Sequence, residues 1–114
     1  MSVDEAMVQS VGVRSAQEVF SAIAEAGKRP RPRSAYQRGL MVAYWWAAGA
    51  PVPAPITRVA AVGAHGPCRA QLLAECQAAA AQLRRAPTAA DHSDFALGAF
   101  AALAWLSGRH DERP

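Results

Sequence analysis

Two apolar stretches, Tyr36–Gly49 (YQRGLMVAYWWAAG) and Phe95–Gly108 (FALGAFAALAWLSG), decide the fold of this 114-residue chain. They align without gaps at an offset of 59 residues, and each follows the pattern aromatic-x2-Gly-x3-Ala-x2-Trp-x2-Gly. Shared alanines mean little, because 28 of the 59 hydrophobic residues are Ala, but the chain has only three Trp. The match of Trp46 with Trp105 therefore predicts a tandem repeat; the alternative is chance similarity between two Ala-rich helices.

Small residues recur at one spacing in both copies. Gly39 precedes Ala43 by four positions, and Gly98 precedes Ala102 by four. Residues at this spacing share a helix face, and a Gly inside a helix costs about 1 kcal/mol relative to Ala, so it usually has a packing reason. We predict that the two repeat helices cross at these residues, related by a pseudo-two-fold axis, with one Trp of each copy filling the space beside the crossing.

Capping patterns mark where further helices begin. Ser-x-x-Glu/Gln is the spacing of a capping box, in which two side chains satisfy the free N–H groups of a helix start. The pattern occurs three times, at Ser2–Glu5, Ser15–Glu18 and Ser34–Gln37. The longest helix is predicted over 68–85. Pro67, directly before this range, is expected at the first helical position, where Pro is well tolerated.

The expected fold is all-α: a small four-helix bundle in one domain, residues 1–114. It consists of two tandem αα-hairpins, about residues 15–49 and 67–108, and a long connection containing Pro and Gly, residues 50–66, joins them. A possible extra short helix at residues 1–11 and a flexible tail at residues 109–114 complete the prediction.

The repeat helices have almost no polar face, since Gly39–Ala50 and Phe95–Leu106 carry no charge. A helix that is apolar all round should be buried on all sides, and this short chain has little material for covering two of them. Either residues 50–66 and the N-terminal segment wrap them, or a second subunit does. We expect a homodimer, and a non-enzymatic adaptor or regulatory protein that binds a protein partner. The expected interaction residues are Tyr44, Trp45, Trp46 and Trp105.

Charge is distributed unevenly along the chain, whose net charge is +3. No Asp or Glu occurs between Ala26 and Ala74, although this stretch holds seven basic residues. An antiparallel bundle would place the basic turn 28–33 at the same end as Arg84 and Arg85, which predicts, as the alternative function, binding of phosphate or nucleic acid. The alternative is an ordinary solvated turn, in which the many arginines reflect GC-rich codon usage and not anion binding. The candidate anion-binding residues are Lys28, Arg29, Arg31, Arg33, Arg84 and Arg85.

Cys68 is the third and weakest candidate, as the nucleophile of a small cysteine enzyme. It follows Pro67 at a helix start, where backbone N–H groups lower a thiol pKa, and His65 and His92 could pair with it. The alternative is a small buried residue, and no local signature of a cysteine hydrolase surrounds it. The spacing of His and Cys residues fits no zinc module, so neither a metal nor another cofactor is expected.

The sequence predicts a cytoplasmic protein without a membrane segment. Its acidic start, MSVDEAMVQS, lacks the apolar run of a secretory signal, and no stretch reaches the roughly 18 apolar residues that span a bilayer. Cys68 and Cys76 lie too far apart on one helix to bridge each other, and free thiols fit a reducing compartment.

Overall fold

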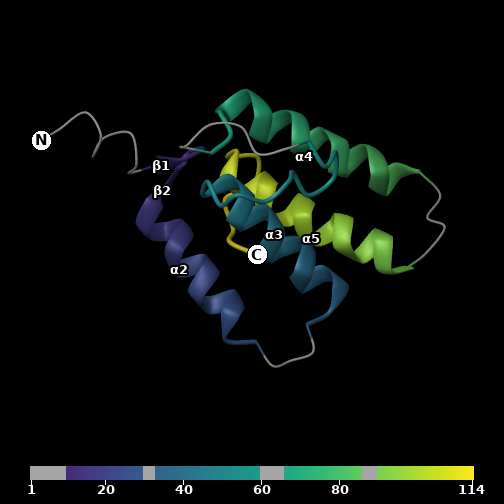
Figure 1. Cartoon of the computed structure of the whole chain (residues 1–114), viewed down its shortest axis with the longest axis horizontal. Helices are drawn as coiled ribbons and strands as arrows, with labels where there is room; N and C mark the ends of the chain where they lie inside the picture. The colour runs from purple at the N-terminus through teal and green to yellow at the C-terminus, as the bar shows by residue number, and fades with distance from the viewer. Residues whose placement is uncertain (1–9, 30–32, 60–65, 86–89) are drawn as a thin grey trace, which may run out of the picture.

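The structure, a computed structural model, describes residues 10–29, 33–59, 66–85 and 90–114. Within these ranges a short antiparallel hairpin precedes four helices (Figure 1), so the predicted small all-helical bundle is confirmed. The strands are β1 (Ser10–Val11) and β2 (Arg14–Ser15), and the helices are α2 (Ala16–Gly27), α3 (Ala35–Ala47), α4 (Arg69–Arg84) and α5 (Ala90–Leu106). None of these four helices has the length and hydropathy needed to cross a membrane.

The predicted N-terminal helix over residues 1–11 is wrong at its last two residues. Ser10 and Val11 pair with β2, because Gly12 adopts a φ of 63° at the first position of a two-residue turn. Such turns favour Gly where φ is positive. Residues 1–9, including the first capping pattern, lie outside the described residues.

The capping boxes at the starts of α2 and α3 are confirmed. The Ser15 hydroxyl accepts from the Glu18 N–H at 3.1 Å, and the Glu18 carboxylate accepts from the Ser15 N–H at 3.1 Å. Hydrogen bonding from Ser15, above all from its backbone N–H, holds the pKa of Glu18 below its ordinary value. Ser34 and Gln37 make the same reciprocal pair at 3.2 Å.

Helix α4 begins slightly later than predicted. Cys68 is its N-cap, with an extended backbone (φ −78°, ψ 170°), so Pro67 precedes the cap instead of occupying the first helical position. The Gln71 side chain accepts from the Cys68 N–H at 2.7 Å, which satisfies the cap from within the first turn.

Helices α3 and α5 cross at the predicted glycines. A Cβ atom on Gly39 would lie 2.0 Å from the Phe95 carbonyl oxygen, and one on Gly98 would lie 2.0 Å from the Tyr36 carbonyl oxygen. The two contacts exchange under the 59-residue offset, so this crossing is locally two-fold. The origin of the two copies by duplication stays a prediction.

The two helices also end alike. Gly49 and Gly108 both take positive φ, 97° and 84°. The next residue in each copy donates its N–H to the carbonyl five positions earlier, at 2.9 Å from Ala50 and 2.8 Å from Arg109. Glycine is favoured here because other residues are strained in the left-handed conformation that closes the helix.

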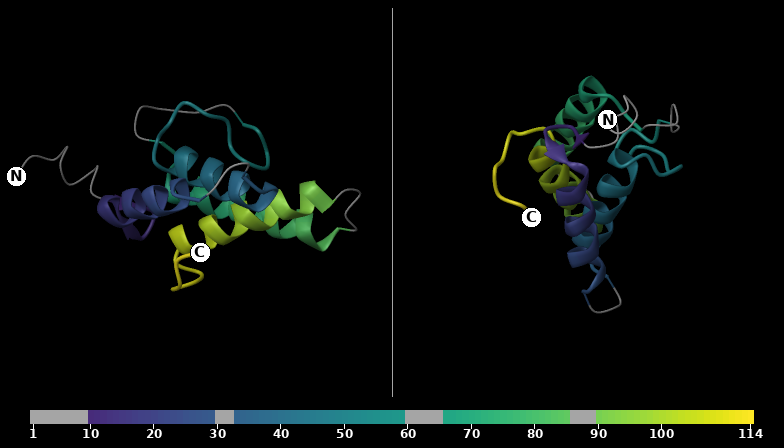
Figure 2. Two further views of the ribbon diagram at one scale, coloured as in Figure 1. Left: turned by 90° about the horizontal axis from the view of Figure 1, so that it is seen from below. Right: turned by 90° about the vertical axis from the view of Figure 1, so that its left-hand side faces the viewer.

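The N-terminal hairpin covers the C-terminal end of α5 (Figure 2). The Val13 N–H donates to the Leu106 carbonyl at 2.9 Å, and Arg14 Nε donates to the Trp105 carbonyl at 2.8 Å. The Arg14 guanidinium also lies 4.9 Å from the centroid of the Trp105 ring. This arginine therefore adds a second donor to the Trp105 carbonyl, which also accepts from the Gly108 N–H at 3.2 Å, and it shields an aromatic face.

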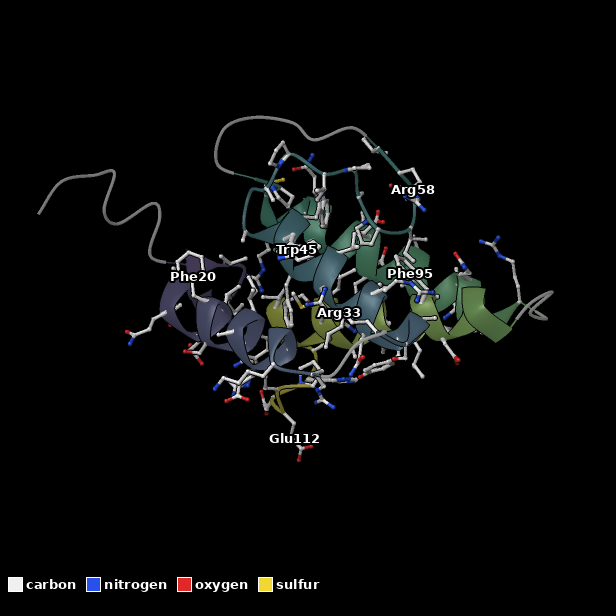
Figure 3. The ribbon with its side chains drawn as sticks, turned by 60° about the horizontal axis from the view of Figure 1, so that its bottom comes forward. Phe20, Arg33, Trp45, Arg58, Phe95 and Glu112 are labelled. Carbon is white, nitrogen blue, oxygen red and sulfur yellow. The ribbon has the colours of Figure 1, made fainter. Side chains whose placement is uncertain are left out.

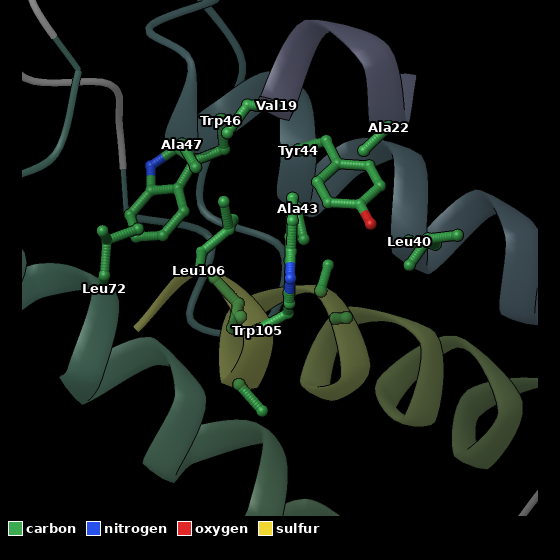
Figure 4. Packing of buried hydrophobic residues seen from close by; sticks show 14 of the residues in the cluster. Val19, Ala22, Leu40, Ala43, Tyr44, Trp46, Ala47, Leu72, Trp105 and Leu106 are labelled. Carbon is green, nitrogen blue, oxygen red and sulfur yellow. The ribbon is translucent and has the colours of Figure 1, made fainter. Parts of the chain in front are cut away.

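The connection after α3 covers another part of the core. Ala54 is buried, and Val52 and Ile56 pack against the buried cluster that Figure 4 shows between α3, α4 and α5. Among the described residues of α3 and α5, the large apolar side chains left exposed are Trp45 and Leu97. The chain itself thus covers much of the apolar surface of α3 and α5 for which a second subunit was expected.

The expected flexible tail makes specific contacts at its first two residues. Arg109 Nη1 lies 3.8 Å from the Cys76 sulfur, and the His110 ring packs edge-on against Phe100 with centroids 5.7 Å apart. Arg14 Nη2 donates to the His110 carbonyl at 2.7 Å. These contacts place the start of the tail against α4 and α5.

Candidate functional site

The expected aromatic surface is largely core. Tyr44, Trp46 and Trp105 are 1%, 7% and 3% exposed, whereas Trp45 is 37% exposed. Tyr44 and Trp105 pack edge to face, with centroids 6.2 Å apart. The close crossing of α3 and α5 directs these rings inward, so of the four expected interaction residues only Trp45 presents a substantial surface.

The hydroxyl of Tyr44 is buried without a hydrogen-bond partner among the described residues. Burial, the largest cause, raises the pKa of Tyr44 to about 12 from its ordinary 10.0. A desolvated phenol resists ionisation because its charged form loses hydration.

Replacing Tyr44 with Phe should weaken the alkaline sensitivity of the fold. The unfolded chain ionises this phenol near pH 10.0 and the folded protein near pH 12, so its stabilising contribution is complete below pH 10 and is lost as pH rises through 12. Urea unfolding from pH 8 to pH 12 should therefore show a smaller loss of stability for Tyr44→Phe than for the wild type. Near neutral pH the variant should be as stable or up to about 1 kcal/mol more stable.

Tyr36→Phe is the matched control for this measurement. It removes the other phenol of the chain and leaves Tyr44 in place, so the wild-type loss above pH 10 should persist. Identical alkaline profiles for Tyr44→Phe and the wild type would contradict the burial of an un-ionised Tyr44.

The predicted anion site is not assembled. Figure 1 shows the C-terminal ends of α2 and α4 at separate edges of the molecule, because α4 pairs with α5 and not with α2. Lys28 is paired with Glu25 at 3.6 Å, and Arg33 contributes its carbonyl to a bond from Arg38 at 2.9 Å. Arg31 lies outside the described residues. The structure thus separates Lys28, Arg29 and Arg33 from Arg84 and Arg85.

The two cysteines lie in different environments. Cys68 is exposed at the start of α4, and Cys76 is fully buried. Burial, the largest cause, raises the pKa of the Cys76 thiol, and the neighbouring Arg109 opposes this shift. His65 lies outside the described residues, as does the side chain of His92, so the Cys–His pairing stays a prediction.

A cleft of about 290 Å³ opens between α4 and the connection that follows α3. The Trp46 side chain, which packs beside Leu72 (Figure 4), contributes one wall. Most of the other walls are small or apolar groups from α4 and the connection. The lining residues are Trp46, Ala54, Thr57, Val59, Pro67, Gln71, Ala74 and Glu75.

Glu75 fixes the connection against α4. It is only 3% exposed, and Oε2 accepts the backbone N–H groups of Ile56 and Thr57, the second at 2.8 Å. Oε1 accepts from the Thr57 hydroxyl, also at 2.8 Å. A buried carboxylate is tolerated when such donors replace its hydration. Glu75 is absent from the predicted site residues, although a charged residue on the apolar stripe with Leu72 and Cys76 was a usable signal.

The outer part of the connection is a closed loop. The Ala54 N–H donates to the Val59 carbonyl at 3.0 Å, and the Arg58 N–H donates to the Ala54 carbonyl at 3.1 Å. Arg58 has a φ of 63°, in the left-handed region that non-glycine residues rarely adopt. Figure 3 shows Arg58 at the outer edge of this loop.

This geometry suits binding. Binding sites are typically concave and mainly apolar, with a few placed polar groups, and a volume near 300 Å³ is at their lower limit. Of the polar lining side chains, Glu75 is buried and Gln71 is exposed, and both already accept hydrogen bonds from the protein backbone. An apolar group of the size of one side chain therefore fits the walls best. The chain matches no protein-family model, no curated protein and no solved structure.

Proposed function

We propose that this protein is a non-enzymatic binding module that holds an apolar side chain of a protein partner in the cleft between α4 and the connection. The observation that carries the proposal is the apolar cleft itself, with Trp46 in one wall and with the connection, which forms another wall, fixed by Glu75. A fixed cleft binds with less loss of conformational freedom than one that must form on contact.

The cleft also refines the role of the aromatic residues. Trp46, one of the four residues expected to bind a partner, is 7% exposed yet lines the cleft. Large aromatic side chains in well-packed pockets contribute heavily to binding energy. The cytoplasm remains the proposed location, since Cys68 and Cys76 are free thiols.

Filling the cleft should abolish partner binding. Ala74 lines the cleft and is exposed on α4, so Ala74→Phe places a ring in the space without disturbing the core. With a photoreactive residue replacing Val59 at the cleft, covalent capture of the partner in living cells should fall at least about tenfold in this variant.

Ala70→Phe is the matched control. Ala70 is exposed one turn earlier on α4 and does not line the cleft. This control should retain wild-type capture. Undiminished capture by a folded Ala74→Phe protein would refute the proposed site.

A further inference from the structure

We infer that the partner's main chain lies across the opening of this cleft and that the Gln71 amide donates a hydrogen bond to one of its carbonyl oxygens. The inference rests on the proposed function and adds the polar contact that accompanies the apolar anchor. Its basis is the hydrogen bonding of the polar side chains that line the cleft.

The side-chain acceptors of the lining are already engaged. Glu75 Oε2 accepts from two backbone N–H groups of the connection, and Oε1 accepts from the Thr57 hydroxyl. The Thr57 hydroxyl oxygen in turn accepts from the Val59 N–H at 3.4 Å. The other polar side chains of the lining are Gln71 and Trp46, whose indole is a donor only. The side chains of the cleft therefore offer an occupant donors and not acceptors.

The cap of α4 determines which end of the Gln71 amide is available. Its oxygen accepts from the Cys68 N–H at 2.7 Å, so turning the amide over would set its nitrogen against a second donor. In the described part of the chain this is the one hydrogen bond of the Gln71 side chain. The amide nitrogen thus keeps its two N–H groups for a ligand. Because the cap already orients the amide, binding costs less conformational freedom than it would for a freely rotating side chain.

The position of Gln71 favours a main-chain acceptor. Gln71 is exposed, whereas Glu75 in the same lining is only 3% exposed, so Gln71 lies toward the opening of the cleft. The cleft, about 290 Å³ in volume, suits one apolar side chain, and the backbone that carries this side chain must then stay at the opening. Main-chain carbonyl oxygens lie only a few bonds from the anchor, and every residue of the partner supplies one.

Gln71→Glu tests the amide without removing the cap. A carboxylate oxygen can still accept from the Cys68 N–H, as the Glu18 carboxylate accepts from the Ser15 N–H at the start of α2. The variant lacks the N–H donors and sets an acceptor against the partner's carbonyl. Gln37→Glu is the matched control, because Gln37 makes the same capping bond at the start of α3, does not line the cleft and gains the same charge.

Two small probes separate the polar contact from the apolar one. N-acetyl-phenylalanine N-methylamide carries the Phe side chain with main-chain carbonyls on both sides, and propylbenzene carries a similar apolar group without them. Each is titrated into ¹⁵N-labelled protein, and the readouts are the indole N–H resonance of Trp46 and the side-chain amide resonances of Gln71. The blocked phenylalanine should shift both, and it should bind Gln71→Glu at least about fivefold more weakly than the wild type or Gln37→Glu. Propylbenzene should bind the wild type and both variants alike.

The outcomes separate this inference from the proposed function. If the blocked phenylalanine binds the wild type and Gln71→Glu equally, the cleft holds an apolar group without the carbonyl contact, and only the inference fails. An equal loss for both probes in Gln71→Glu indicates altered apolar walls and also overturns the inference. If neither probe shifts the Trp46 resonance, the proposed function fails as well. A Trp46 resonance that moves on dilution without a probe identifies a second copy of the chain as the occupant and overturns both.

Discussion

Gly98→Ala should lower the free energy of unfolding by about 3 kcal/mol, although Ala is the better helix former by about 1 kcal/mol. The new Cβ would lie 2.0 Å from the Tyr36 carbonyl oxygen and 3.0 Å from the Leu40 backbone nitrogen. Both atoms belong to the backbone of α3, so no side-chain rotation relieves the overlap. The two helices must separate, and the packed side chains around the crossing lose contact. Denaturant unfolding followed by circular dichroism measures this loss.

Gly39→Ala should cost a similar amount, since its Cβ would meet the Phe95 carbonyl oxygen at 2.0 Å. The double variant should lose clearly less than the sum of the two single losses, because helices already separated by one Cβ accommodate the other. Gly27→Ala is the control. Gly27 ends α2, and a Cβ there would have nothing within 4 Å, so this change should be neutral or stabilising by up to about 1 kcal/mol. Wild-type stability for Gly98→Ala would show that α3 and α5 do not cross there.

This crossing is predictable from the sequence because its cause is local. Only a residue without a side chain permits such close approach, so a Gly and an Ala four positions apart in two matched apolar helices are enough to identify the contact. The capping boxes at Ser15 and Ser34 are predictable for the same reason, since each joins atoms three residues apart.

Contacts between distant segments are not predictable in this way. The bond from Arg14 to the Trp105 carbonyl joins residues 91 positions apart, and nothing near Arg14 in the sequence indicates its partner. The cleft depends on a similar long-range contact, between Glu75 and Thr57. No sequence periodicity encodes such pairs, because they arise only once the helices have packed.

Most of the aromatic side chains of α3 and α5 are buried, and the lack of a polar face on these helices does not predict what buries them. An apolar helix surface indicates that something covers it, but not whether the cover is a second subunit or the chain itself. The close crossing at Gly39 and Gly98 brings α3 and α5 into contact over small residues, and the aromatic side chains turn inward. The β1–β2 hairpin and the connection then cover much of the remaining surface. A chain poor in large aliphatic residues thus forms a core by reducing the distance between its helices.

Glu75→Ala should destabilise the protein by about 3 kcal/mol, an effect comparable to that of the crossing glycines. The change removes a carboxylate that accepts from the N–H groups of Ile56 and Thr57 and from the Thr57 hydroxyl. Those donors then lie in a partly buried loop without the acceptor that replaced water. Hydrogen exchange at the Ile56 and Thr57 amides should accelerate by at least about tenfold, since the loop opens without its anchor.

Glu75→Gln distinguishes the loss of an anchor from the loss of a charge. Its amide oxygen can accept both backbone N–H groups, and its amide nitrogen can donate to the Thr57 hydroxyl oxygen, so the bonding pattern survives without the charge. We expect a loss of about 1 kcal/mol and nearly wild-type exchange at the two amides. Because Thr57 and Glu75 both line the cleft, Glu75→Ala should also weaken covalent capture of the partner at the cleft, whereas Glu75→Gln should preserve it. Slow exchange at Ile56 and Thr57 in the Ala variant would mean that contacts other than those of Glu75 hold the connection. Glu75 would then not be the residue that fixes the cleft wall on which the proposed binding function depends.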